Sequence, residues 1–246
     1  LSNLSAMKQL NCALRSVQKI DMSSNMLTSN ELRHLRKHLL ANANVEHIDL
    51  ESNEIESLRP MLCDATGVPC GRLSRLRHLN AKNNCILSMD SLGEVDMPCL
   101  EELFLYRNNI TSIPCASNNL CFFERWQFLQ HIDLGRNNID ILPEGTFRDN
   151  KLLVSIILYE NKLKDVPSGL HHVLLRELWL NGNCISTVDF HGPDQGAATS
   201  PSRSSYTPLL ETLHLHDNAI KVFRSMPHAP FLKHIDLSFN NIDSFE

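Results

Sequence analysis

The chain has 246 residues, of which 42% are hydrophobic and 21% charged, and its formal net charge is −5. This composition is ordinary for a globular protein that is long enough to bury a core. The acidic balance argues against direct nucleic-acid binding, because general nucleic-acid binders carry a basic surplus. The apolar runs are too short to cross a bilayer. We therefore expect neither a nucleic-acid partner nor a membrane span.

The first 16 residues place apolar side chains at roughly helical spacing. They predict an N-terminal covering helix, or the end of a preceding repeat. From residue 17 onward the chain repeats itself, and the repeat is the dominant signal. Nine blocks of eleven residues fit the pattern L-x-x-L-x-L-x-x-N-x-L, with other apolar residues sometimes replacing Leu. The blocks are 17–27, 45–55, 76–86, 100–110, 129–139, 153–163, 175–185, 210–220 and 232–242.

Within each block the apolar positions alternate with polar ones around the centre, which predicts a short strand with one buried face. One strand cannot bury that face alone, so the blocks must stack. The ninth position of every block is Asn, and a buried Asn amide must be paired with nearby turn backbones. We assign these nine residues a structural role: Asn25, Asn53, Asn84, Asn108, Asn137, Asn161, Asn183, Asn218 and Asn240.

This pattern resembles the leucine-rich repeat superfamily, and the resemblance covers residues 17–242. It implies an α/β solenoid, a horseshoe or arc with a parallel β-sheet on the concave face. Helices, turns or extended segments would cover the convex face. Segment 29–43 is similar to ribonuclease-inhibitor repeats, 76–105 to phosphatase-regulator and cilia-associated repeats, and 140–153 and 165–175 to repeats common outside cells.

We expect one nine-repeat domain over residues 17–246, interrupted by a loop at 190–208 that is rich in Ser, Pro, Gly and Ala. That composition buries little surface and predicts a solvated loop, or an arm ordered by a partner or phosphorylated. The chain ends four residues after Ile242. Since a terminal repeat needs a polar cap, we expect a longer parent chain, or an end that a partner covers.

The register places positions 2, 3, 5, 7 and 8 of each block on the concave face. Five apolar or aromatic residues should form one patch there, notched by Gly135: Phe104, Tyr106, Ile157, Tyr159 and Trp179. Arg107, Arg136 and Glu160 should form its rim. Clustered exposed aromatics are typical of interface hot spots. The alternative is that these side chains only pack on one another. On the whole face, twelve acidic residues outnumber seven basic ones, which favours a basic or mixed-charge partner.

His214, His216, His234 and Asp236 fall on two neighbouring blocks and could hold zinc. Imidazoles on a polar sheet are more often solvated, so we assign no metal, and a pH-sensitive contact is the stronger alternative. The sequence contains no phosphate loop, G-x-S-x-G elbow or H-E-x-x-H motif. We therefore expect neither catalysis nor a cofactor.

Eight cysteines are too sparse for a disulfide scaffold, and none pairs in C-x-x-C spacing. Their use favours a cytoplasmic setting, including a cytoskeletal or ciliary one. The extracellular alternative would be marked by bridges between Cys63 and Cys70 or Cys115 and Cys121, or by a sugar on Asn3 or Asn109.

Three functions follow from these observations. The first is a protein-interaction scaffold that binds its partner through the concave aromatic patch. The second is a structural subunit of a cytoskeletal, ciliary or ribonucleoprotein assembly. The third is an extracellular recognition or receptor ectodomain.

Overall fold

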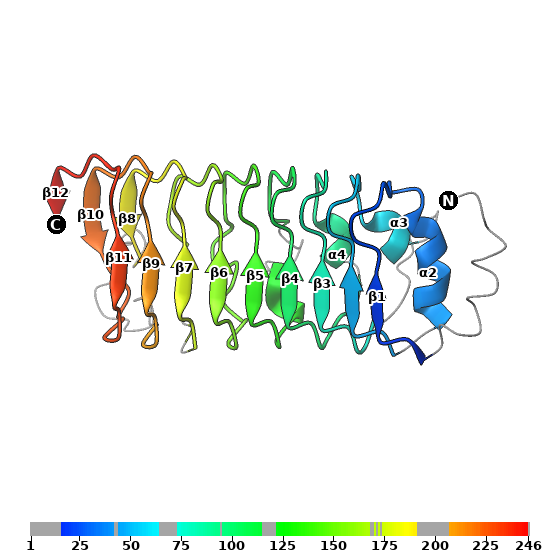
Figure 1. Cartoon of the computed structure of the whole chain (residues 1–246). Helices are drawn as coiled ribbons and strands as arrows, with labels where there is room; N and C mark the ends of the chain where they lie inside the picture. Colours follow the sequence, from blue (N-terminus) through cyan, green and yellow to red (C-terminus); the bar gives the residue numbers. More distant parts are fainter. Residues whose placement is uncertain are drawn as a thin grey trace.

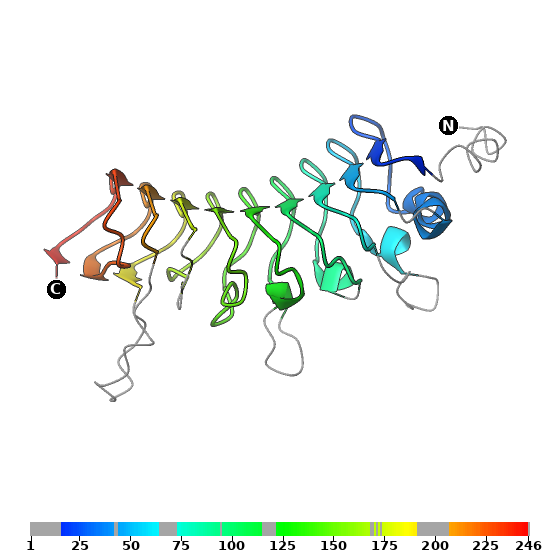
Figure 2. The same cartoon turned by 90° about the horizontal axis from the view of Figure 1, so that it is seen from below.

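In the computed structural model every repeat contributes one strand to a single sheet (Figure 1), and the row of strands curves into an arc (Figure 2). It describes residues 16–41, 44–63, 73–93, 95–114, 122–167, 170, 172, 174–190 and 207–245. The predicted covering helix at the N-terminus and most of the predicted 190–208 loop lie outside the described residues. Phe190 and Thr207, near the two ends of that loop, are buried in the solenoid.

The main sheet has nine parallel strands, in chain order apart from the strands that lie on the other face. They are β1 (Lys19–Asp21), β2 (His47–Asp49), β3 (His78–Asn80), β4 (Glu102–Phe104), β5 (His131–Asp133), β6 (Ser155–Ile157), β7 (Glu177–Trp179), β9 (Thr212–His214) and β11 (His234–Asp236). Each strand occupies positions 3 to 5 of its block, so the predicted solenoid with a parallel sheet is confirmed. Neighbours pair without register shifts, which aligns equivalent positions in rows across the sheet.

The core lies between this sheet and the convex side. The middle residue of each strand points inward, and in β2 to β9 it is almost completely buried, as for Leu79, Leu103 and Leu178. The flanking residues of the same strands are mostly half-buried on the opposite face. This alternation is the period of two that a strand imposes on its side chains.

The convex side changes character along the arc (Figure 2). The N-terminal half carries α2 (Leu32–Ala41), α3 (Arg59–Leu62), α4 (Asp90–Gly93) and the 3₁₀ helix η2 (Phe122–Arg125). The C-terminal end instead carries a second parallel sheet of β8 (Thr187–Asp189), β10 (Val222–Ser225) and β12 (Ser244–Phe245). The mixed repeat types expected from the sequence therefore appear as a helical half and an extended half.

Helix α2 begins after a turn closed by Thr28 and Glu31. The Glu31 carboxylate accepts hydrogen bonds from the backbone N–H of Thr28 at 2.9 Å and from its hydroxyl, while the Thr28 hydroxyl oxygen accepts from Asn30 N–H at 3.3 Å. This reciprocal pairing satisfies amides that the helix cannot pair internally. Leu32 and Leu35 then bury one face of the helix against the core.

Each block turns back after its strand through a residue with positive φ at position 8. The non-glycine residues there have φ between 50° and 57°, and Gly182 has φ 65°. The next residue is the Asn of the motif, whose side-chain amide donates to carbonyls of its own turn. From the second block onward, its oxygen accepts the backbone N–H of position 11 in the preceding block, as in Ile86 to Asn108 at 2.9 Å.

Among the described strands of the main sheet, the first and the last, β1 and β11, each pair with one neighbour. At the C-terminal end, Ile235 in the centre of β11 is 38% exposed, whereas the equivalent Ile132 is 1% exposed. Phe231, Phe239 and Phe245 are also exposed there. Among the described helices, none combines the length and apolar character needed to cross a membrane.

Candidate protein-binding surface

The concave face offers two rows of side chains, because positions 5 and 7 of each block project from the same side of the sheet. In the position 5 row, Phe104, Asp133, Ile157, Trp179 and His214 follow one another on adjacent strands. The position 7 row places Gly135 between Tyr106 and Tyr159. The aromatic residues are half-buried rather than fully exposed, so they lean on one another across the strands.

Four rings form a continuous strip, which we call the aromatic strip: Tyr106, Tyr159, Trp179 and His214. The ring centroids of Tyr106 and Tyr159 are 6.0 Å apart, those of Tyr159 and Trp179 6.3 Å, and those of Trp179 and His214 4.0 Å. The two tyrosine contacts fall in the range of favourable tilted ring pairs. Burial is the main cause that raises the pKa of Tyr159 to about 12, and a side-chain hydrogen bond with Tyr106 is the second.

The absence of a side chain at Gly135 permits the tyrosine contact. Tyr106 and Tyr159 belong to repeats that are not adjacent, and Gly135 belongs to the repeat between them. A Cβ atom at Gly135 would lie 2.9 Å from Cε1 and 3.1 Å from Cδ1 of Tyr159. The Tyr159 ring therefore occupies the space that any other residue would fill.

Phe104 stands apart from the strip. Its row neighbour on β5 is Asp133, which separates it from Ile157. The ammonium of Lys82 lies 4.3 Å from the Phe104 ring centroid and 4.0 Å from the Asp133 carboxylate. Burial raises the pKa of Asp133, although its Oδ1 accepts a hydrogen bond from Gly135 N–H at 3.0 Å. The predicted single patch is thus an aromatic strip and a separate Phe104–Lys82 contact, divided by a buried carboxyl group.

Arg136 and Glu160 border the strip with a two-pronged ion pair. Nε of Arg136 lies 2.8 Å from Oε2 of Glu160, and its Nη2 lies 3.0 Å from Oε1. The same guanidinium lies 5.8 Å from the Tyr106 ring centroid. Arg107 is exposed, and its backbone N–H donates to Gly135. The geometry therefore places Arg136 against the strip more directly than Arg107.

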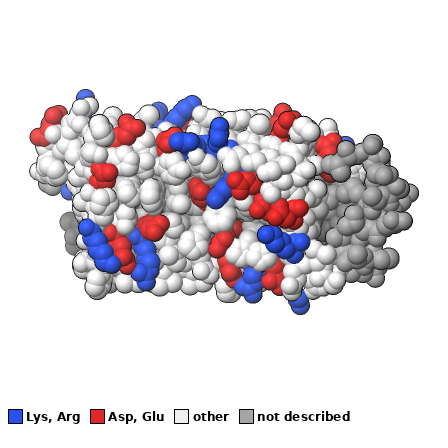
Figure 3. Space-filling view, viewed as in Figure 1, with Lys and Arg blue, Asp and Glu red and all other residues white. Residues whose placement is uncertain are grey.

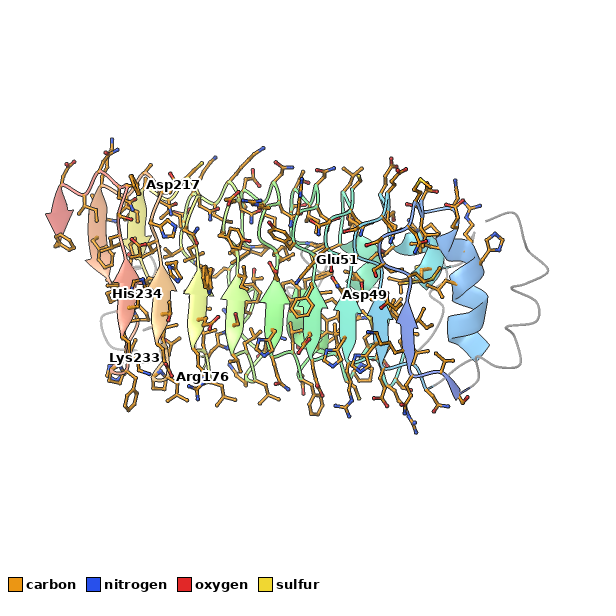
Figure 4. All side chains as sticks on the ribbon, in the orientation of Figure 1. Asp49, Glu51, Arg176, Asp217, Lys233 and His234 are labelled. Atoms are coloured by element: carbon orange, nitrogen blue, oxygen red, sulfur yellow. The ribbon has the colours of Figure 1, made fainter. Side chains whose placement is uncertain are left out.

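Charge is unevenly distributed over the concave face. Figure 3 shows acidic side chains, with Lys and Arg among them, on the central and right-hand part of the face, and a largely uncharged area to the left with Lys and Arg at its lower edge. Asp49 and Glu51 belong to the acidic group (Figure 4). Asn80 donates to both carboxylates, at 3.2 Å and 3.0 Å. The aromatic strip therefore borders an acidic region, with ion pairs on its margin.

Histidines extend the strip further than the tyrosines and the tryptophan alone. His214 contacts Trp179, and its ring centroid lies 5.8 Å from that of His216 and 5.3 Å from that of His234. Nδ1 of His216 lies 3.2 Å from Oδ2 of Asp236. The register shows why these four residues meet, because Asp236 pairs with His214 across β9 and β11.

Of the residues that would mark an extracellular setting, some are described by the structure and others are not. Cys70, Cys115, Cys121 and Asn3 lie outside the described residues. Asn109 is exposed beside the buried Asn108, on the turn that follows β4. Its side chain is therefore accessible in the folded chain.

Comparison with known proteins agrees with this geometry. A family model described as Leucine Rich repeat matches residues 228–244. Mouse podocan is 26% identical over 278 residues, covering 93% of this chain and 44% of podocan. Two observations decide the fold. Nine strands, one from each repeat, pair in register, and an Asn at position 9 follows each of them. The chain is a leucine-rich repeat solenoid.

Leucine-rich repeat proteins similar to this chain include receptors and members of complexes. Pig Toll-like receptor 9 is 29% identical over 214 residues, covering 81% of this chain and 16% of the receptor. A chain in the octameric complex of Latrophilin 3, Unc5D and FLRT2, in which FLRT2 is labelled LRR, superimposes with a TM-score of 0.64. That match has 19% identity and covers 92% of this chain and 62% of the other. The chain spans less than half the length of podocan and of the Toll-like receptor.

Proposed function

We propose that this chain is a non-enzymatic recognition module that binds a protein partner on its concave face, with the aromatic strip at the centre of the contact. The observation that carries the proposal is the strip itself. Tyr106, Tyr159 and Trp179 each contact another ring, yet each keeps part of its surface exposed on the sheet. Tyr and Trp are the residues most enriched among binding hot spots.

The strip is also held in place before any partner arrives. Its residues come from consecutive or nearly consecutive strands of a rigid sheet, and their rings restrict one another. A pre-organised surface loses little conformational entropy on association, so more of the contact energy appears as affinity. Arg136 and Glu160 supply a polar margin of the kind that surrounds a hot spot.

The charge pattern supports a partner with basic or mixed charge. Asp49 and Glu51 lie on the same face (Figure 4), two repeats before Tyr106, the first residue of the strip. An acidic region attracts a basic surface during encounter and repels a phosphate backbone. We therefore propose a protein or peptide ligand whose apolar anchor is flanked by basic residues on the side that faces Asp49 and Glu51.

The relatives support the extracellular recognition alternative more than the cytoplasmic scaffold. One is named a receptor, and the structural match belongs to a complex of Latrophilin 3 and Unc5D with FLRT2. We propose that the chain works as a recognition domain of this kind. An N-linked sugar on the exposed Asn109, in protein isolated from its natural source, would support that setting.

The test is selection of binders on the whole chain, followed by affinity measurement. A displayed protein and peptide library is enriched on the wild-type chain, and each purified binder is titrated against the triple variant Tyr106→Ala, Tyr159→Ala, Trp179→Ala. We expect binding to weaken by about 100-fold or more, because each removed ring is a hot-spot residue. Circular dichroism should show an unchanged melting temperature, since the core is intact.

The matched control replaces exposed apolar side chains outside the strip, Leu87→Ala with Phe128→Ala. Binding that survives in this control and fails in the triple variant supports the strip. Selected binders that hold the triple variant as tightly as the wild type would overturn the proposal. A loss of binding accompanied by unfolding is resolved by Tyr159→Phe and Trp179→Phe, which keep the rings and should keep most of the affinity.

A further inference from the structure

We propose that His214, His216 and Asp236 form a binding site for a divalent transition metal ion, with Zn²⁺ as the fitting ion and His234 as an additional ligand. This inference goes beyond the proposed recognition function and does not depend on it. One ligand atom from each of His214, His216 and Asp236 lies within 4.8 Å of the others. Two imidazoles and a carboxylate are a common ligand set of zinc sites that keep one position open.

The sheet brings these side chains together. His214 and His216 are two residues apart, so both project from the concave face at β9. Asp236 ends the neighbouring strand β11 and pairs with His214 in the register. Tetrahedral Zn²⁺ with bonds of about 2.0–2.1 Å separates its ligand atoms by roughly 3.3–3.5 Å. Each pair of ligand atoms therefore needs to approach by at most about 1.5 Å to close the site around the ion, which small changes of side-chain torsion can supply.

The ligand atoms are available for a metal. Nδ1 of His214 is buried and has no hydrogen-bond partner within the described part of the chain. Nδ1 of His216 faces Oδ2 of Asp236 at 3.2 Å, as expected for two ligands of one ion.

A second layer of contacts holds the carboxylate in position. Oδ1 of Asp236 accepts hydrogen bonds from Ser238 N–H at 3.0 Å and from the Ser238 hydroxyl at 2.7 Å. This leaves Oδ2 directed at His216. Such outer partners fix the orientation of ligating carboxylates in metal sites. On the other side, the Trp179 ring packs on His214 and restricts its rotation.

The nearby cations do not occupy the site. Arg176 and Lys233 both bind the Glu211 carboxylate, at 2.6 Å each. Figure 4 places these labelled side chains at the lower, starting ends of β7 and β11, whereas Asp236 and His216 lie at or beyond the arrow-tip ends of their strands. His234, labelled on β11, is exposed and lies beside His214, so it can turn toward the ion or leave that position to water.

The test is calorimetric titration of the whole chain with ZnCl₂, after alkylation of its cysteines because thiolates also bind zinc. We expect one site per chain, removed by the double variant His216→Gln, Asp236→Asn. Ser238→Ala should bind about ten-fold more weakly, which is the effect of losing an outer partner. The matched control is His47→Gln with His78→Gln, a stacked histidine pair at the other end of the same face, which should bind zinc as the wild type does.

A second measurement uses only the wild-type chain. Diethyl pyrocarbonate modifies accessible imidazoles, and Zn²⁺ should protect His214 and His216 but not His47 from it, as read by mass spectrometry. The site would be overturned if the chain bound no zinc. It would also be overturned if the His216→Gln, Asp236→Asn variant still bound zinc and Zn²⁺ did not change the modification of His214 and His216 in the wild type. Performing the partner selection in the presence of a chelator keeps its outcome independent of either result.

Discussion

The asparagine at position 9 of each block, which is buried in the second to the sixth block, supplies hydrogen bonds that the turn backbone cannot complete alone. Asn108 donates to carbonyls of Ala81, Leu105 and Tyr106 and accepts from Ile86 N–H. The side chain therefore links its own turn to that of the preceding block. Its equivalent in the first block, Asn25, is exposed and bonds only to carbonyls of its own turn.

This contrast predicts unequal costs for the same substitution. Asn108→Ala leaves several buried backbone groups without partners and should lower the free energy of unfolding by about 2–4 kcal/mol. Asn25→Ala should cost less than about 1 kcal/mol, since water can replace its bonds. Urea denaturation followed by circular dichroism measures both. Equal losses in the two variants would contradict the linking role of the side chain.

The carboxyl group of Asp133 predicts a pH dependence of stability. Burial raises its pKa in the folded chain above the ordinary value of 3.8. In the window between these two values the folded state binds more protons, so the stability that this group contributes is present at low pH and lost as the pH rises. Asp133→Asn keeps an acceptor for Gly135 N–H and removes the titration. The variant should therefore gain stability relative to the wild type as the pH rises from about 3.5 to about 7.

Asp21 is the control of opposite sign. Hydrogen bonds from the Ser23 side chain and backbone lower its pKa. Its contribution is therefore present above the unfolded pKa and lost as the pH falls. Asp21→Asn should lose stability relative to the wild type over the same rise in pH. Melting temperatures at the two pH values test both variants, and parallel trends in the two would contradict the assignment for Asp133.

At the scale of the element, each turn depends on one residue in the left-handed region. Position 8 has positive φ in all nine blocks, but only Gly182 is a glycine. A side chain in this region costs about 1–2 kcal/mol relative to the right-handed one, and glycine avoids most of that cost. In the non-glycine blocks that have a following repeat, a hydrogen bond from the position 8 N–H to a carbonyl of that repeat supports the conformation, as from Ser52 to Lys82 at 3.0 Å.

Introducing a glycine at one of these turns and removing the glycine from another should shift stability in opposite directions. Ser52→Gly should raise the free energy of unfolding by about 0.5–1 kcal/mol, because it relieves the backbone at φ 57°. Gly182→Ala should lower it by about 1–2 kcal/mol, since its Cβ would also lie 3.0 Å from Cγ of Glu160. Chemical denaturation measures both. A gain in Gly182→Ala would show that position 8 is not the strained residue.

The strands and the fate of their side chains could be predicted from the sequence because the repeat fixes both register and face. Tyr106, Tyr159 and Gly135 were placed on one surface by counting positions alone. Counting positions could not predict the burial of Asp133 or the ring contact of Trp179 with His214, because both depend on how neighbouring side chains fill the space between strands. Thr28 and Glu31 carried a readable signal for the start of α2, the T-x-x-E spacing of a capping box.

The convex side was less predictable for a different reason. Its segments differ in length and have no common motif, so the sequence offers helices, turns and extended chain as alternatives. The second sheet of β8, β10 and β12 forms because three of these segments happen to stack in parallel at one end of the arc. Local pattern specifies each repeat, whereas the convex layer depends on contacts between repeats.

At the scale of the whole molecule, the paired strands and packed helices of the described residues belong to neighbouring repeats, so local stability should follow the number of neighbours. Strands β4 to β6 are each covered on both sides, and their central residues are 0–1% exposed. Strand β11 has one neighbour in the main sheet, and its central Ile235 is 38% exposed. In a repeat array, stability is approximately a sum over repeats and the interfaces between them.

Hydrogen exchange of the 246-residue chain should therefore be graded along the arc. The bonded amides of β11 should exchange at least about ten-fold faster than those of β5, which corresponds to an opening free energy lower by about 1.4 kcal/mol. Appending one further repeat with a polar outer face to the C-terminus should slow exchange in β11 toward the β5 rate, because it adds an interface on the exposed side of β11. The same extension should leave β5 unchanged. Uniform exchange along the chain, or slowing at β5 as well, would mean that the nine repeats open as one unit rather than as a series of neighbours.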